Sequence, residues 1–150
     1  MKVFLEDEAA TTALAERFRA ALPEKLSGLT VLLEGELGAG KSTFARGLIR
    51  AMDHSGPVPS PTYTLVEPYH LPSGIVYHVD LYRVASEEEL RFLGWNELDD
   101  GLRLVEWPDR APELANAADI RLTLSYAGVG RNVQIDGLSE QGMQLIADIN

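Results

Sequence analysis

The chain has 150 residues, no cysteine, and 13 Lys and Arg against 23 Asp and Glu, which gives a net charge of −10. These values exclude disulfides and thiolate metal sites and are typical of a cytoplasmic domain, whose acidic surface repels the phosphates of nucleic acid. No run reaches the roughly 18 apolar residues of a membrane span, and the acidic start at residues 6–8 argues against a signal peptide. We therefore expect residues 1–150 to form one domain, monomeric or weakly self-associating when alone and without membrane contact.

The first predicted elements are a short strand over residues 3–5 and a helix from about residue 7 to residue 22. The helix places Leu14, Phe18, Ala21 and Leu22 on one face. Thr11 and Thr12 lie in its first two turns. They either cap the helix or contact a bound nucleotide.

The most informative motif is residues 35–42, which match the P-loop pattern G-x-x-x-x-G-K-[ST] at every fixed position. A buried strand is predicted before the motif, over residues 30–34, and a helix after it, over residues 43–52. The alternative, a glycine-rich turn with a chance lysine, is disfavoured because the chain has only three lysines.

Each part of the P-loop predicts a contact with a nucleoside triphosphate. Gly38 and Gly40 allow the backbone to turn its N–H groups toward the phosphates. Lys41 is expected to reach the β- and γ-phosphates, and the Ser42 hydroxyl is expected to bind Mg²⁺.

The next segment, residues 53–64, contains three prolines within five residues and is predicted to be a stiff loop. Its hydroxyl residues Ser60, Thr62 and Thr64 are candidates for contact with Mg²⁺ and the γ-phosphate. The alternative is a plain surface connection.

Two carboxylates, Asp80 and Glu106, each end a predicted strand. Asp80 ends the second of two paired strands, residues 65–69 and 75–81, and Glu106 follows the strand over residues 102–105. In a parallel sheet both would lie at one edge, near the phosphates. His78 is expected to orient Asp80 or to pack, since Mg²⁺ prefers oxygen ligands.

The remaining chain is predicted to add smaller elements. Residues 86–89 match a capping box that begins a helix through residue 93, and residues 96–99 form a turn without a guanine signature. Residues 119–126 alternate as a strand with Tyr126 facing inward, and residues 131–135 return in an antiparallel hairpin.

The last predictions concern an arginine after the hairpin turn and the C-terminal helix. Arg131 follows the hairpin turn and faces either the nucleotide or solvent. Ser139 caps a final helix, whose buried face is predicted to be Met143, Ile146 and Ile149.

Four motifs in order resemble the TsaE (YjeE) family of P-loop ATPases: residues 37–44 with Arg46-Gly47, residues 60–66, residues 78–83, and Glu106-Trp107. The resemblance covers residues 11–131. It implies a three-layer α/β P-loop fold with a mixed sheet, ATP as the nucleotide, and an accessory role in forming threonylcarbamoyladenosine in tRNAs that decode ANN codons.

The resemblance also implies partners and site residues. TsaD-like and TsaB-like partners are implied, with a TsaC-type enzyme acting in the same pathway and tRNA reached only through the complex. Nucleotide contacts are implied for Thr11, Gly38, Ala39, Gly40, Lys41, Ser42, Thr43 and Arg131, and Mg²⁺ contacts for Ser42, Asp80 and Glu106.

The expected reaction is ATP hydrolysis, slow in isolation and stimulated by partners, with Lys41, Asp80 and Glu106 as the catalytic residues. Either carboxylate could orient the attacking water, and Arg83 is either an arginine finger or a structural salt-bridge residue. The rival functions are a P-loop small-molecule kinase, although no arginine-rich lid is evident, and a non-hydrolysing ATP switch.

Overall fold

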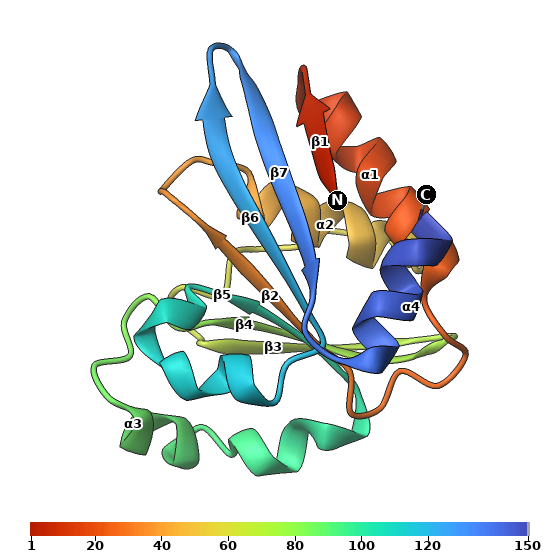
Figure 1. Cartoon of the computed structure of the whole chain (residues 1–150). Helices are drawn as coiled ribbons and strands as arrows, with labels where there is room; N and C mark the ends of the chain where they lie inside the picture. Colours follow the sequence, from red (N-terminus) through yellow and green to blue (C-terminus); the bar gives the residue numbers. More distant parts are fainter. Residues whose placement is uncertain (150) are drawn as a thin grey trace.

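A seven-stranded sheet with helices on both faces dominates the computed structural model, which describes residues 1–149 (Figure 1). Asn150, the last residue of the predicted domain, lies outside the described residues. In chain order the elements are β1 (Lys2–Leu5), α1 (Glu8–Ala21), β2 (Thr30–Gly35), α2 (Lys41–Ala51), β3 (Val66–Leu71), β4 (Gly74–Asp80), α3 (Glu87–Phe92), β5 (Leu102–Glu106), β6 (Ile120–Ala127), β7 (Gly130–Gly137) and α4 (Glu140–Ile149). Short 3₁₀ helices lie at Trp95–Asp100, Pro108–Arg110 and Pro112–Asn116.

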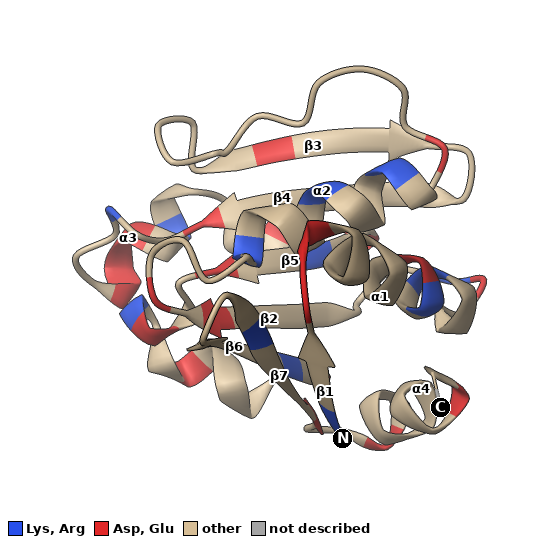
Figure 2. Ribbon diagram, turned by 90° about the horizontal axis from the view of Figure 1, so that it is seen from above, with Lys and Arg blue, Asp and Glu red and all other residues tan. Residues whose placement is uncertain are grey.

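The sheet is mixed, as expected. Its order is β1-β7-β6-β2-β5-β4-β3, which the view from above displays from one edge to the other (Figure 2). The central strands β6, β2, β5 and β4 are parallel, whereas β1 and β7 on one side and β3 on the other run antiparallel to their neighbours. The predicted C-terminal hairpin is therefore confirmed as β6 and β7, and Pro68, which cannot donate a ladder hydrogen bond, lies on the edge strand β3.

The strand side chains alternate between two hydrophobic cores. In β2, Val31 and Leu33 pack in the core under α1, α2 and α4, and Leu32 packs in the second core with Val79 and Val105. Successive residues of a strand point to opposite faces, so an unbroken apolar run is what a central strand needs. None of the helices within residues 1–149 is long and apolar enough to cross a membrane.

Helices α1 and α2 pack closely and hold the start of α2 in place. The rings of Phe18 and Phe44 meet edge to face at 5.5 Å. A Cβ on Gly47 would lie 3.1 Å from the Ala15 Cβ, so a small residue is required where the helices approach each other. Because the P-loop leads directly into α2, this contact also fixes the position of the loop.

The N-terminus of α1 is capped by Asp7, so the first of the two alternatives for Thr11 and Thr12, that they cap this helix, is wrong. The Asp7 carboxylate accepts a hydrogen bond from the Ala10 N–H at 2.8 Å. Asp7 precedes the helix and has extended backbone, as an N-cap residue requires, whereas both threonines lie inside the helix.

Helix α3 forms as predicted, but Ser86 makes no side-chain capping bond. The Glu89 carboxylate accepts a hydrogen bond from the Ala85 N–H, one residue before the N-cap, at 3.1 Å, so the bond does not belong to the predicted capping box. The segment predicted as a turn at residues 96–99 is part of the 3₁₀ helix Trp95–Asp100.

The buried face of α4 differs from the prediction. Ser139 does cap the helix, accepting from the Gly142 N–H at 3.0 Å, but Met143 is 59% exposed and Leu145 is buried instead. A Cβ on Gly142 would lie 1.8 Å from the Asp119 carbonyl oxygen. Gly142 therefore marks the face that meets the sheet, and hydrophobic periodicity cannot detect a glycine in that role.

Candidate active site

The P-loop is a glycine-rich turn between the end of β2 and the start of α2. Gly35, Gly38 and Gly40 have φ values of 153°, 81° and 113°, a region that glycine adopts at little cost. Helix α2 begins at Lys41, and its N-cap, Gly40, offers no side chain to the first N–H groups. These amides and the positive end of the helix dipole form a site for an anion.

Lys41 lies inside this turn and is only 5% exposed. Its Nζ donates to the carbonyl oxygens of Gly35 at 2.5 Å and Glu36 at 3.0 Å, and it lies 4.1 Å from the centre of the Trp107 ring. Burial lowers the pKa of Lys41, and the nearby carboxylates of Glu106, Asp80 and Asp109 act in the opposite direction. The three carboxylates thus offset part of the effect that burial has on the ammonium group.

The two strand-end carboxylates meet beside the P-loop. Strands β4 and β5 are parallel neighbours, and their register pairs Asp80 with Glu106. The Ser42 hydroxyl donates to Glu106 Oε1 at 3.0 Å. The prediction that both carboxylates lie at one edge of the sheet is therefore confirmed, and β5 brings one of them to the P-loop serine.

His78 supports Glu106 and does not contact Asp80. Its Nε2 lies 2.5 Å from Glu106 Oε2, both residues are almost fully buried, and Nδ1 has no hydrogen-bond partner within the described chain. In the register of β4 and β5, His78 pairs with Leu104, so Glu106 is its diagonal neighbour on the same face. Of the two alternatives for His78, orienting Asp80 is therefore wrong, because it was drawn from one strand without its neighbour.

Asp80 is held by the loop that precedes β3. Its Oδ2 accepts from the Thr62 hydroxyl at 3.0 Å, and Thr62 in turn contacts the Ser60 hydroxyl at 2.9 Å. The Tyr82 N–H donates to the other oxygen, Oδ1, at 2.9 Å. Ser60 and Thr62 thus lie at the site as predicted, whereas Thr64 is exposed and lines neither cavity beside the P-loop.

Arg83 packs on the same loop instead of reaching the P-loop. Its guanidinium lies 4.4 Å from the centre of the Tyr63 ring, and it makes no salt bridge with any residue of the range 1–149. Neither cavity beside the P-loop includes it. In this structure Arg83 occupies neither of its two predicted roles.

A cavity of about 280 Å³ opens on the Lys41 side of the P-loop. We call it the carboxylate-side cavity. Its walls come from the P-loop, the loop before β3 and the ends of β4 and β5, and include Lys41, Ser42, Thr62, Asp80, Glu106 and Trp107.

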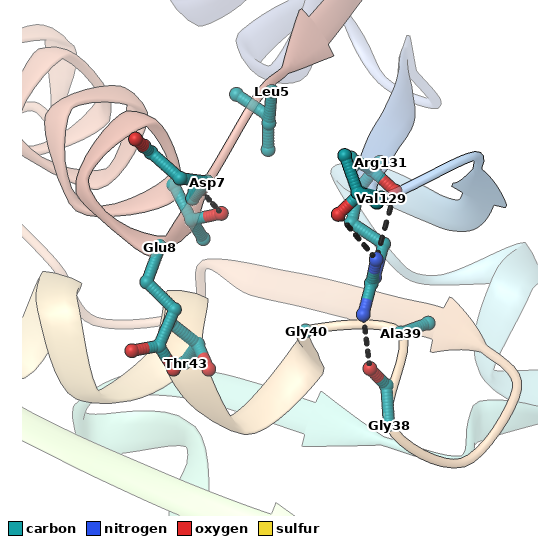
Figure 3. Close-up of a pocket in the computed structure, with 11 residues that line it drawn as sticks. Leu5, Asp7, Glu8, Gly38, Ala39, Gly40, Thr43, Val129 and Arg131 are labelled. Atoms are coloured by element: carbon teal, nitrogen blue, oxygen red, sulfur yellow. Dashed lines mark hydrogen bonds between the residues drawn. The ribbon is translucent and has the colours of Figure 1, made fainter.

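A second cavity, of about 150 Å³, opens on the other side of the same loop. We call it the hairpin-side cavity, and Figure 3 shows its lining. The segment Asp7–Glu8 of the N-terminal region lies across the cavity from Arg131 of the hairpin, with Gly38–Gly40 and Thr43 beneath them. Thr11 also lines this cavity. The structure therefore brings Thr11 and Arg131 to the P-loop, where the resemblance places them.

Two aromatic residues of the site were not recognised from the sequence. Trp107 adopts φ 59°, and its ring lies beside Lys41. Tyr126, expected to face the core, is 48% exposed, and its hydroxyl donates to the Leu37 carbonyl oxygen at 2.7 Å. It does lie on the inward face of β6, but there β6 has passed the core and meets the P-loop.

Comparison with known proteins gives one consistent result. Residues 5–133 match the family described as threonylcarbamoyl adenosine biosynthesis protein TsaE. The tRNA threonylcarbamoyladenosine biosynthesis protein TsaE of Haemophilus influenzae is 39% identical over 121 residues, which cover 79% of this chain and 77% of that relative. The protein of the same name from Nostoc is 36% identical over 135 residues, which cover 86% of this chain and 80% of that relative.

The fold has a solved counterpart as well. The crystal structure of Bacillus subtilis YdiB aligns with a TM-score of 0.77 at 25% sequence identity. The alignment covers 99% of this chain and 93% of that one.

Proposed function

The chain belongs to the TsaE family of threonylcarbamoyl adenosine biosynthesis proteins, and from that premise we propose that it is a Mg²⁺-dependent ATPase. It serves the complex that forms threonylcarbamoyladenosine in tRNAs decoding ANN codons, and residues 1–150 act as one cytoplasmic ATPase domain. The observation that carries the proposal is the bond from the P-loop Ser42 hydroxyl to the strand-end carboxylate of Glu106.

The donor atoms at this site suit a hard cation that arrives with a nucleotide. They are the Ser42 hydroxyl and the carboxylates of Asp80 and Glu106, and oxygen is the ligand that Mg²⁺ prefers. Within residues 1–149 no cluster of three or more His, Cys, Asp and Glu side chains could hold a metal, and phosphate oxygens and water would complete the set of ligands. When bound, Mg²⁺ supplies charge neutralisation on the transferring phosphoryl group.

In the proposed reaction a water attacks the γ-phosphorus, and the bond to the β–γ bridging oxygen breaks, which releases ADP and inorganic phosphate. Lys41 and the P-loop amides stabilise the negative charge that develops. Glu106, which is hydrogen-bonded to Ser42 and His78, provides a carboxylate oxygen for the cation. Asp80, which accepts a hydrogen bond from Thr62 of the proline-rich loop before β3, orients the water.

The proposed partners are TsaD-like and TsaB-like proteins, and tRNA is reached only through them. The net charge of −10 opposes direct binding of tRNA by this chain. Tyr63, which is 80% exposed and carries Arg83 against its ring, offers a contact surface next to the loop that holds Asp80. ATP binding and hydrolysis at the site would change this surface and so favour one docking state.

The test is phosphate release by the purified protein with and without a TsaB–TsaD pair, alongside tRNA binding by the protein alone. We expect slow turnover alone, clear stimulation by the pair, and no tight tRNA binding. Lys41→Ala serves as the inactive control for contaminating ATPases. Fast turnover that ignores the pair, or transfer of the phosphoryl group to a metabolite instead of water, would overturn the proposal.

A further inference from the structure

The tip of the β6–β7 hairpin holds the P-loop from outside through Tyr126 and Arg131. The Tyr126 hydroxyl donates to the Leu37 carbonyl oxygen at 2.7 Å, and Arg131 donates to the next carbonyl, that of Gly38, at 3.2 Å. We infer that Tyr126 is a positioning residue for the phosphate-binding backbone. The inference rests on the proposed function, because it concerns how the same nucleotide site is organised.

The inference follows from the geometry of the peptide bond. No peptide bond in residues 1–149 is cis, and in a trans peptide the C=O and the following N–H point in opposite directions. A hydroxyl that holds the Leu37 carbonyl outward therefore turns the Gly38 N–H inward, toward the phosphate side. Tyr126 sets the direction of a phosphate-binding amide without touching the phosphate.

The next peptide is fixed at both of its polar groups. Arg131 holds the Gly38 carbonyl, and the N–H of that peptide, which belongs to Ala39, donates to the Glu36 carbonyl oxygen at 3.0 Å. Successive peptides of the loop are thus held by the hairpin on one side and by the turn itself on the other. Preorganised amides bind an anion more tightly because no ordering is left to be done on binding.

The hairpin tip and the P-loop also fit each other in shape. Tyr126 and Arg131 are directly opposite in the β6–β7 register, and the guanidinium lies 4.3 Å from the centre of the tyrosine ring. Arg131 is fixed further by the Gly130 carbonyl at 2.8 Å. A Cβ on Gly38 would lie 2.6 Å from the tyrosine hydroxyl, so Tyr126 and the glycine occupy complementary space.

The test is Tyr126→Phe, which removes the hydroxyl and keeps the ring that Arg131 packs on. Affinities for ATP and for tripolyphosphate, which lacks the nucleoside, are measured by calorimetry or competition, together with the melting temperature. We expect both affinities to fall about three- to tenfold, the value of one hydrogen bond. Tyr77→Phe is the matched control. It removes a tyrosine hydroxyl that donates to Asp100 at 2.6 Å, and neither of these residues lines either cavity.

The outcomes separate the inference from the function on which it rests. If the unaltered protein fails to bind ATP, the proposed function fails. If it binds ATP and Tyr126→Phe binds ATP and tripolyphosphate equally well, the inference fails alone. A loss seen with ATP but not with tripolyphosphate would show that Tyr126 contacts the nucleoside, which also overturns it. If Tyr77→Phe lost as much affinity as Tyr126→Phe, the effect would reflect the stability of the whole protein, which also contradicts the inference.

Discussion

The two cavities beside the P-loop differ in how deeply their charged side chains are buried. On the carboxylate side, Lys41, Asp80 and Glu106 are each at most 5% exposed, and hydrogen bonds link the two carboxylates to neighbouring hydroxyls, an amide and a histidine. On the hairpin side, Asp7, Glu8 and Val129 are exposed. Charges interact far more strongly where water is excluded. If the proposed function is right, we therefore expect catalysis to depend on the buried side and the exposed side to adjust binding.

The largest expected effect is that of Lys41→Ala on the buried side. Lys41 contacts loop carbonyls and the Trp107 ring, so the fold should survive its removal. Loss of a preorganised charge should lower the rate of phosphate release by at least about a hundredfold. Lys25→Ala, which removes an exposed lysine, is the control. Near-normal turnover by the folded Lys41 variant would contradict the contrast between the two cavities.

The next effect concerns the carboxylates. Asp80→Asn and Glu106→Gln should each lower Mg²⁺-dependent turnover by about a hundredfold, and the double variant should lose less than the product of the two. Sub-additive loss is expected because the register of β4 and β5 places both residues at one point. The measurement is a double-mutant cycle at saturating Mg²⁺. Fully additive losses would mean that the two side chains act at separate places.

A smaller effect is expected from His78, which acts through Glu106. His78→Ala should raise the Mg²⁺ concentration for half-maximal activity about tenfold, a typical cost of losing a support to a metal-binding carboxylate. Mg²⁺ titrations of turnover measure it, and thermal melting reports any loss of stability from the buried cavity. His70→Ala, on the exposed part of β3, is the matched control. An unchanged Mg²⁺ requirement in the His78 variant would assign the histidine to packing alone.

The sequence predicted the buried side of the site better than the exposed side. Asp80 and Glu106 were recognisable because each ends an apolar strand, and parallel strands end at one edge of a sheet. The link between His78 and Glu106 needs the pairing of β4 with β5, which no local pattern gives. Trp107 and Tyr126 were not recognised, because the sequence pattern of an aromatic residue at a strand end is the same whether the ring packs in the core or against a ligand-binding loop.

The hairpin-side cavity escaped a purely local interpretation because it joins distant parts of the chain. Strand β1 pairs with β7, so Leu5 lies opposite Arg131 and the start of α1 lies beside the hairpin tip. From the residues alone, contact with the nucleotide was one of two alternatives for Thr11 and for Arg131, and the resemblance to a known family favoured it. Alternation along residues 120–126 correctly gave the direction of each side chain but not where the core ends, which depends on what covers the sheet.

The smallest effect, expected on the hairpin side, sharpens the comparison. Thr11 is 4% exposed and lines the hairpin-side cavity, and its hydroxyl donates a long hydrogen bond of 3.4 Å to the Asp7 carbonyl. Thr11→Val keeps the volume and removes the hydroxyl, so one hydrogen bond to a bound nucleotide is lost. We expect KM for ATP to rise about threefold with kcat unchanged, as for loss of uniform binding. Thr12→Val, which changes the exposed neighbour outside this cavity, should change neither constant. A fall in kcat caused by Thr11→Val, as large as that from the carboxylate variants, would erase the distinction between a catalytic and a binding side.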